Sequence, residues 1–459
     1  MLAPEEKLKL VSRPYLAITP RFKDGSASPR EFLEHCLADL SALEPKIGAF
    51  VHLNVDAARD AADASGARWR SGCPLSPIDG MPIGIKDIIE TADFPTENGS
   101  PLYLGWRSER DAASVAALRE AGAVILGKTV TTEFASTEPR GTRNPHDLRR
   151  TPGGSSSGSA AGVATGMISA GLGTQVIGST IRPASYCGCY GLKVSLGALN
   201  RGGSLDGLSQ SVTGVLAATL EDAWQVASEI ATRAGGDPGY PGLFGPRSMP
   251  APRMPSRVAF LETAGWAAAS SDAKAAMNDA LARLKSAKVE VLTRQSNAKV
   301  AAVEEAITKA WPLSMRINAW EWRWPLNTYR NRDASKISRA MLDRLAQAEA
   351  MSLDDYRRDL AQRDKDRALY AELAGECEAC ISLSAPAAAP MGLGSTGNPS
   401  CTVHASYLGI PSVSLPVLAD EGLPLGLQVA GFINGDAATA AAAAAIAGCS
   451  KDVVGRGHG

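Results

Sequence analysis

Two glycine-rich stretches carry the serines of this sequence that could act as nucleophiles. The first, Pro152–Gly162, reads PGGSSSGSAAG and places four serines beside four glycines. The second, Gly173–Ala184, contains Ser179 after a glycine and Arg182 three residues later. A serine hydroxyl attacks a carbonyl carbon efficiently only when a base removes its proton. The chemistry of these stretches therefore depends on which side chain supplies that base.

A histidine base would make the first stretch the elbow of a serine hydrolase. Gly154–Gly158 fits the pattern GxSxG, but that motif requires a buried strand immediately before it. The preceding residues, NPHDLRRTP, do not resemble a buried strand. Of the five histidines, only His404 and the terminal His458 lie downstream, and no clear acidic loop precedes His404. The sequence therefore disfavours a histidine-dependent hydrolase.

Other motif matches do not call for a cofactor. Gly122–Thr129 fits the phosphate-loop pattern GxxxxGK[ST], but its four central residues are Ala, Val, Ile and Leu, which favour a buried strand. The eight cysteines include CxxC and CxC pairs without a second pair at zinc spacing. We therefore expect no cofactor and no metal ion.

A lysine can replace histidine as the base if its amine is neutral at the working pH. This requires a pKa lowered from about 10.4 towards 7 or 8, and burial in apolar surroundings has that effect. Lys86 follows Pro82–Ile85, an apolar run typical of a short buried strand. The alternative is an ordinary lysine at the end of a strand, paired with Asp87. The local sequence leaves both interpretations open.

Three separated stretches together resemble the amidase signature family. They are Pro82–Asp87, Thr151–Ala161 and the segments between Gly173 and Gly188. Weaker similarity covers most of the chain from Pro77 to Val429, and residues 249–376 are much less distinctive. Within the family, the serine-rich stretch and the IRPA segment are most similar to the malonamidase type.

The resemblance implies a Ser–cis-Ser–Lys triad. By motif position, Lys86 is the base, Ser155 is the bridging serine with a cis backbone, and Ser179 is the nucleophile. Ser179 would attack the amide carbonyl, and its proton would pass through Ser155 to Lys86. Backbone N–H groups would stabilise the oxyanion. The expected oxyanion hole consists of Val176, Ile177, Gly178 and Ser179.

Two positions near the expected nucleophile bear on the substrate. In malonamidase-like sequences the arginine at the position of Arg182 suits a substrate carboxylate, and a structural salt bridge is the equal alternative. Family members usually have Gly-Gly before the nucleophile, whereas this chain has Ile177-Gly178. Either the loop backbone differs there or the acyl pocket is narrower. We expect hydrolysis of a small amide, with a carboxylate-bearing amide favoured, to acid and ammonia.

Two other functions keep the same fold. Some family members belong to multi-protein amidotransferases, and this chain could be a subunit of that kind. A non-catalytic binding protein is the third hypothesis, because Ile177 lies beside the expected oxyanion hole.

The elements that must position these residues alternate between strands and helices. Apolar runs predict strands at Met81–Lys86, Ala123–Leu126 and Gly173–Ile177, and helical spacing predicts helices at Ala112–Ala121 and Ala160–Ala170. The alternation favours an α/β fold, and the resemblance implies a central mixed sheet with helices on both faces. We expect one domain over residues 1–459, with a signature core at 77–200 and a variable, mainly helical segment at 249–376.

Composition narrows the class of partner. The net charge is −1, which does not favour nucleic acid or an acidic membrane. The N-terminal segment carries charges where a signal peptide needs apolar residues, and no apolar run is long enough to cross a membrane. We expect a cytoplasmic protein with a small-molecule amide as its partner, and we consider a homodimer. Four of the eight tryptophans lie in Trp311–Trp324, where we expect mainly packing, with a pocket wall as the alternative.

Overall fold

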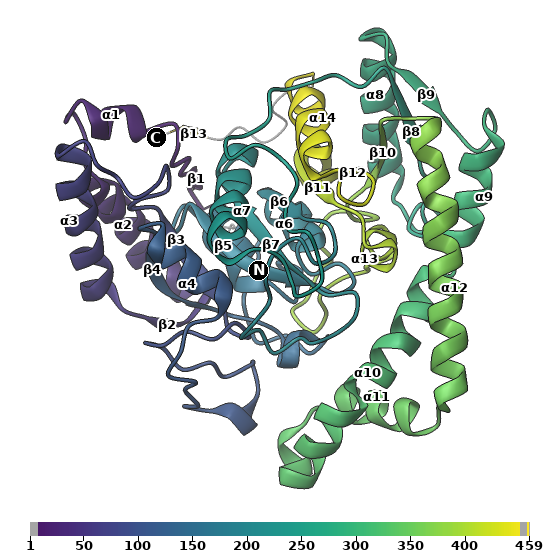
Figure 1. The fold of residues 1–459 in the computed structure, drawn as a ribbon, viewed down its shortest axis with the longest axis horizontal. Helices are drawn as coiled ribbons and strands as arrows, with labels where there is room; N and C mark the ends of the chain where they lie inside the picture. The colour runs from purple at the N-terminus through teal and green to yellow at the C-terminus, as the bar shows by residue number, and fades with distance from the viewer. Residues whose placement is uncertain (1–7, 450–456, 459) are drawn as a thin grey trace, which may run out of the picture.

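A mixed β-sheet with helices on both faces forms the centre of the molecule (Figure 1). The computed structural model describes residues 8–449 and 457–458 of the 459. The first seven residues, part of the charged N-terminal segment, lie outside the described residues, as do 450–456 and 459. The architecture confirms the predicted α/β class. No helix in the described ranges is long and apolar enough to cross a bilayer.

The large sheet has eleven strands in the described residues, in the order β2-β4-β3-β5-β7-β6-β11-β12-β10-β8-β9. β3 runs parallel to both β4 and β5, whereas β5 and β7 are antiparallel. Because β3, β4 and β5 are parallel, their carboxyl ends meet at one edge of the sheet, where ligands bind in α/β folds. The strands are β2 (Phe50–Leu53), β3 (Pro82–Lys86), β4 (Val124–Thr129), β5 (Ala170–Gln175), β6 (Tyr190–Lys193), β7 (Val212–Ala217), β8 (Arg257–Phe260), β9 (Glu290–Leu292), β10 (Ala379–Leu383), β11 (Ser412–Asp420) and β12 (Leu423–Ala430), with β1 (Val11–Ser12) and β13 (Gly457–His458) forming a separate pair.

Helices cover the sheet because successive strand residues point to opposite faces. In β4, Ile125 packs in a cluster with α4, α7, α8 and α14, whereas Val124 and Leu126 pack with α2, α3, α5 and α6. Two apolar layers therefore enclose the sheet. The helices are α1 (Thr19–Lys23), α2 (Pro29–Ile47), α3 (Val55–Arg70), α4 (Ala113–Glu120), α5 (Ser157–Ala164), α6 (Ile181–Cys187), α7 (Leu220–Ala234), α8 (Ser271–Ser286), α9 (Ala298–Ile307), α10 (Ala310–Asp333), α11 (Arg339–Glu349), α12 (Leu353–Ala371), α13 (Val403–Leu408) and α14 (Asp436–Gly448).

One predicted helix near the expected nucleophile is too long. The pattern predicted a helix over Ala160–Ala170, but α5 ends at Ala164 and β5 begins at Ala170. Gly166 has a φ of +77°, a left-handed conformation that commonly terminates helices. The next strand therefore begins three residues before the predicted Gly173 and ends at Gln175. Ser179 consequently lies in a loop beyond the strand.

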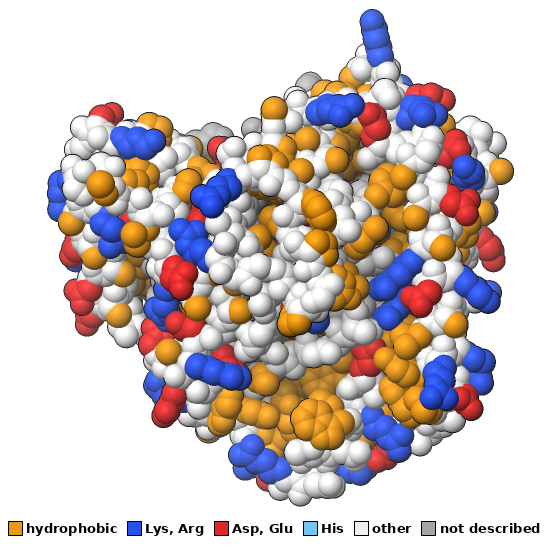
Figure 2. Space-filling view, in the orientation of Figure 1, with side chains coloured by type: hydrophobic (Ala, Val, Ile, Leu, Met, Phe, Trp, Pro, Cys, Tyr) orange, Lys and Arg blue, Asp and Glu red, His pale blue; other side chains and the backbone are white. Residues whose placement is uncertain are grey.

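Helices α10, α11 and α12 extend from the sheet as a separate group in Figure 1. They pack back onto loops of the sheet edge, since Trp322 of α10 and Met341 of α11 share one buried cluster with Phe134 and Leu208. On the same side, hydrophobic side chains gather around a hollow beside these helices (Figure 2). The helical group thus forms one wall of the region above the strand ends.

Candidate active site

Lys86 is the last residue of β3, and its side chain is fully buried. Its Nζ donates hydrogen bonds to Ser155 Oγ at 2.7 Å and to Thr174 Oγ1 at 2.8 Å. Burial lowers the pKa of this amine to about 7, while the nearby Asp206 carboxylate acts in the opposite direction. Because about half of the amine is neutral near pH 7, Lys86 can accept a proton there.

The alternative pairing of Lys86 with Asp87 is not formed. Asp87 Oδ1 lies 3.1 Å from the Nζ of Lys128, the fifth residue of β4. Lys128 also donates to Thr96 Oγ1 at 2.7 Å and to the Pro95 carbonyl at 3.1 Å. Burial lowers the pKa of Lys128, and the Asp87 carboxylate opposes that shift. Lys128 is therefore the salt-bridged lysine, and Lys86 faces two hydroxyls.

Ser155 lies in the loop before α5, and its side chain is buried. The Gly154–Ser155 peptide bond is cis, as the resemblance implied. Gly153 has a φ of +83°, and a Cβ there would lie 2.9 Å from Pro183 Cα, so only glycine fits this approach. The Thr132 N–H donates to the Ser155 carbonyl at 3.3 Å. Close packing on both sides thus holds the Ser155 hydroxyl against Lys86.

Ser179 lies in the loop between β5 and α6, with 9% of its surface exposed. The Ser156 N–H donates to the Ser179 carbonyl at 3.4 Å, which joins the two serine loops. This bond between backbone groups connects the two loops. No hydrogen bond between the hydroxyls of Ser155 and Ser179 is among those described. Gln175 Oε1 braces the second loop by accepting from the Thr180 and Ile181 N–H groups, both at 3.0 Å.

The backbone N–H groups of Val176–Ser179 have no acceptor among the described hydrogen bonds. Gly178 is required there, because a Cβ would lie 2.2 Å from Thr402 Oγ1. Ile177 is not among the described residues with a positive φ, and its side chain packs against the helical cluster that includes Val403. The isoleucine is thus accommodated with an ordinary backbone, and the amides remain available to an oxyanion.

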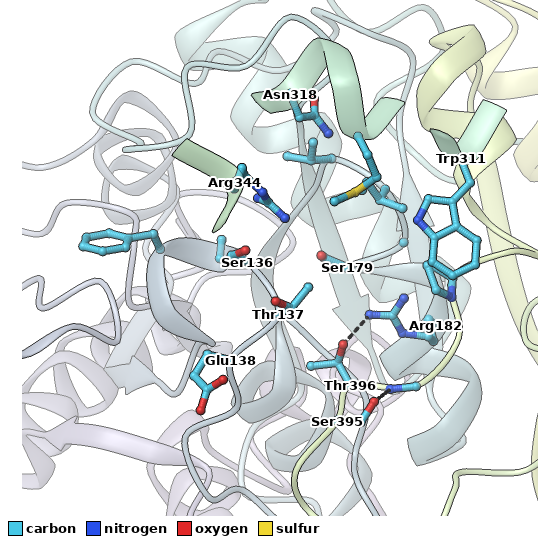
Figure 3. Close-up of a pocket in the computed structure, with 18 of the residues that line it drawn as sticks. Ser136, Thr137, Glu138, Ser179, Arg182, Trp311, Asn318, Arg344, Ser395 and Thr396 are labelled. Atoms are coloured by element: carbon cyan, nitrogen blue, oxygen red, sulfur yellow. Dashed lines mark hydrogen bonds between the residues drawn. The ribbon is translucent and has the colours of Figure 1, made fainter. Parts of the chain in front are cut away.

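A cavity of about 660 Å³ lies over Ser179 (Figure 3). Trp311 and Trp322 of α10 line it, so the pocket-wall alternative holds for these two tryptophans. Trp320 instead stacks on Tyr356, and Trp324 is 77% exposed. The cavity is large enough for a ligand of drug size.

Arg182 lines the same cavity from α6. Its Nη2 donates to the Gly154 carbonyl at 2.8 Å and to Thr396 Oγ1 at 3.0 Å. In the part of the chain that the structure describes, no carboxylate forms an ion pair with it, so the salt-bridge alternative is not realised. Burial lowers its pKa to about 10, and the guanidinium stays charged at neutral pH.

His404 does not act as a partner of these serines. It is buried in α13, and neither ring nitrogen has a hydrogen-bond partner within the described residues. Burial lowers its pKa to about 4, with the Lys193 charge adding to the shift. His404 therefore does not supply the base of a histidine-dependent elbow at the Gly154–Gly158 stretch.

Sequence reasoning assigned no role to Thr174, Asp206 or Arg344. Thr174 lies within the segment Gly173–Gly188 that resembles the family, so its place in that motif could have indicated a role near Lys86. Asp206 is buried and lines the cavity, and neither of its carboxylate oxygens accepts a hydrogen bond from another described residue. Burial raises its pKa, while Arg201, Ser211 and Lys86 oppose the shift. Nothing in the local pattern around Asp206 or Arg344 indicated that they would reach the cavity.

The chain is similar to known amidases and to subunits of amidotransferases. The family model described as Amidase matches residues 31–439. One subunit of the glutamyl-tRNA(Gln) amidotransferase of Chloroflexus aggregans is 44% identical over 221 residues, which are 47% of this chain and 45% of that protein. The corresponding protein of Anaeromyxobacter sp. is 42% identical over 218 residues, with coverage of 46% and 44%. These matches span less than half the length of the curated relatives.

Solved structures match over most of the chain. A crystal structure of an amidase has a TM-score of 0.82 and 26% identity, over 94% of this chain and 98% of that one. A peptide amidase in complex with the competitive inhibitor chymostatin has a TM-score of 0.77 and 25% identity, over 94% and 96%. Since the family model covers 31–439 of 459 residues, this chain belongs to the Amidase family, the amidase signature family whose motifs its sequence resembles.

Proposed function

We propose that this chain is an amidase that hydrolyses the C–N bond of a linear amide to an acid and ammonia. The observation that carries the proposal is the 2.7 Å hydrogen bond between Lys86 Nζ and Ser155 Oγ, together with the low pKa of that lysine. A buried amine that titrates near neutral pH is suited to general-base catalysis.

In the proposed mechanism, Lys86 takes the proton of Ser155 as Ser155 takes the proton of Ser179. Ser179 Oγ attacks the amide carbonyl, and the free N–H groups of Val176–Ser179 stabilise the oxyanion. The relay then returns a proton to the leaving nitrogen, which departs as ammonia and leaves an acyl-enzyme. Water, deprotonated through the same relay, cleaves the ester and releases the acid.

A carboxylate on the substrate, close to the scissile bond, would suit Arg182. Its Nη2 is engaged by the Gly154 carbonyl and Thr396, whereas its Nη1 donates none of the described hydrogen bonds. The guanidinium is charged and lies on the cavity wall beside Ser179. This arrangement supports a role in orienting an anionic amide.

The proposal is tested by ammonia release from a panel of short amides with the isolated chain. We expect kcat/KM to rise as the pH increases through about 7, because only the neutral amine of Lys86 accepts a proton. With one such group, kcat/KM at pH 8 should be about tenfold higher than at pH 6. A flat profile over this range would exclude Lys86 as the base.

Replacing Asp206 with asparagine should move the acid limb of that profile to lower pH. The Asp206 carboxylate raises the pKa of Lys86, so removing its charge lets the amine stay neutral in more acidic solution. The profile of kcat/KM checks this shift. Asp222→Asn serves as the control, because Asp222 is also buried but accepts hydrogen bonds from Tyr15 and Leu16 instead. An unshifted limb in Asp206→Asn would contradict the coupling.

A second candidate function is that of one component in a multi-protein amidotransferase. The similarity to a glutamyl-tRNA(Gln) amidotransferase subunit of Chloroflexus aggregans favours it, although that match covers 47% of this chain. This candidate predicts little ammonia release by the isolated chain and restored activity when partner subunits are added. Release by the isolated chain at an ordinary enzymatic rate favours the independent amidase. Assembly as a homodimer stays a prediction.

A further inference from the structure

Arg344 is a cation on the cavity wall and forms no ion pair with an acidic side chain in the part of the chain that the structure describes. Its Nε is buried and has no hydrogen-bond partner within the described ranges. Burial alone lowers its pKa to about 10, so no carboxylate of residues 8–449 lies close enough to compensate the charge. The guanidinium is still protonated at neutral pH. The residue is half-buried, and a partly desolvated charge of this kind is costly unless an opposite charge joins it.

The side chain of Arg344 points into the cavity (Figure 3). In this view Ser179 lies between Arg344 and Arg182, so the two guanidinium groups approach the serine from different sides. Arg344 belongs to α11, and its neighbour Leu345 is anchored in the buried cluster that contains Phe134. The packing of α11 therefore holds the guanidinium over the cavity, and its position does not depend on a surface loop.

Arg182 and Arg344 differ in how many of their guanidinium nitrogens already donate hydrogen bonds within the protein. Arg182 already donates from Nη2 to the Gly154 carbonyl and to Thr396 Oγ1. Arg344 donates none of the described hydrogen bonds, so both of its terminal nitrogens remain for a ligand. Such a fork matches the two oxygens of a carboxylate. Two acidic residues also line the cavity, but neither forms a described ion pair with Arg344. Glu138 is exposed, and Asp206 lies near Lys86 and Arg201.

We propose that Arg344 binds a carboxylate of the substrate at a subsite separate from Arg182. The body of the substrate then lies against the aromatic wall of Trp311 and Trp322, with its amide at Ser179. The substrate class is an amide with an apolar chain or ring that ends in a carboxylate. A cavity of about 660 Å³ has room for such a molecule and is large for the shortest amides. This inference rests on the proposed amidase function, because it assigns a role to the same cavity.

Turnover of two matched amides tests the subsite. The probes are 3-(4-carboxyphenyl)propanamide and 3-(4-methylphenyl)propanamide, which differ only in the terminal group. We expect the wild type to prefer the carboxylate by about 10- to 100-fold in kcat/KM, the range expected for charged hydrogen bonds. Arg344→Gln should remove this preference mainly through KM and leave the methyl analogue within about threefold of wild type.

Arg339→Gln is the matched control on the same helix. Arg339 is exposed and pairs with Asp343, so its loss should leave the preference unchanged. Arg344→Lys keeps the charge without the fork and should retain part of the preference. An equal loss on both amides in Arg344→Gln would overturn the proposal, since it would mark Arg344 as a structural residue.

Binding of the acid product separates this inference from the amidase proposal. Calorimetry with Ser179→Ala and 3-(4-carboxyphenyl)propanoate requires no turnover. We expect a Kd about 10- to 100-fold weaker when Arg344→Gln is added to this background. If no amide is hydrolysed but this dependence is found, the amidase proposal fails and the anion subsite stands. If Kd does not depend on Arg344, the subsite is wrong whatever the activity.

Discussion

Replacing Ser179 with alanine should lower kcat/KM for the best short amide by about 10⁵-fold, a loss typical of a removed nucleophile. No acyl-enzyme can form without this hydroxyl, and the N–H groups of Val176–Ser179 alone would leave only weak catalysis. Steady-state ammonia release measures the loss. Mass spectrometry of the wild type with a slow substrate should place the acyl group on the peptide that contains Ser179.

Ser157→Ala is the matched control from the first serine stretch. Ser157 Oγ donates to the Val130 carbonyl at 3.2 Å and makes no described contact with Lys86. Its removal should change kcat/KM by less than about threefold, since it takes no part in the relay. Full turnover in Ser179→Ala, with the acyl group found on another serine, would refute the assignment of the nucleophile.

Removing the amine of Lys86 should have the second largest effect. Lys86→Met keeps a buried side chain of similar length, but it leaves Ser155 without a base. We expect kcat/KM to fall by about 10⁴-fold at pH 7, as for other members of a catalytic triad. The dependence of the residual rate on pH near 7 should also disappear, because the titrating group is gone. Initial rates over pH 5.5 to about 9 measure both effects.

Two other buried lysines, Lys193 and Lys128, serve as controls, because they are buried like Lys86 but form no described hydrogen bond with Ser155. Lys193 has a pKa that burial lowers to about 7, but its Nζ donates to the Ile410 carbonyl at 2.8 Å. Lys128 pairs with Asp87. Lys193→Met and Lys128→Met should lower stability, measured by thermal unfolding, and keep most of kcat/KM in the folded fraction. A larger loss of rate in either variant than in Lys86→Met would identify a different base.

Contiguous motifs predicted the framework of the site. Pro82–Lys86 is a short apolar run, and it forms the buried strand β3 that ends at Lys86. Both Ser155 and Ser179 lie in loops beside glycines, Gly154 and Gly178, whose replacement would place a Cβ too close to a neighbouring side chain. These features are local, because strand propensity and glycine conformation depend on neighbouring residues. The α/β class followed from the same alternation of elements.

Residues that reach the cavity from distant segments could not be predicted in this way. The pairing of Asp87 with Lys128 depends on the register between β3 and β4, which left Lys86 free to contact Ser155. Trp311 lies in α10 and Arg344 in α11, and both reach the cavity only because these helices pack over the sheet edge.

The sequence by itself therefore determined the fold class, and its resemblance to the amidase signature family named the three candidate catalytic residues, because each of them lies in a short motif that can be matched residue by residue. Only the tertiary structure decided the environment that tunes them. Burial lowers the pKa of Lys86, and Asp206 opposes that shift from a separate loop. Arg344 brings to the cavity wall a charge that has no acidic partner among the described residues. Desolvation and Coulomb interactions depend on distances between segments far apart in the chain, and packing sets those distances.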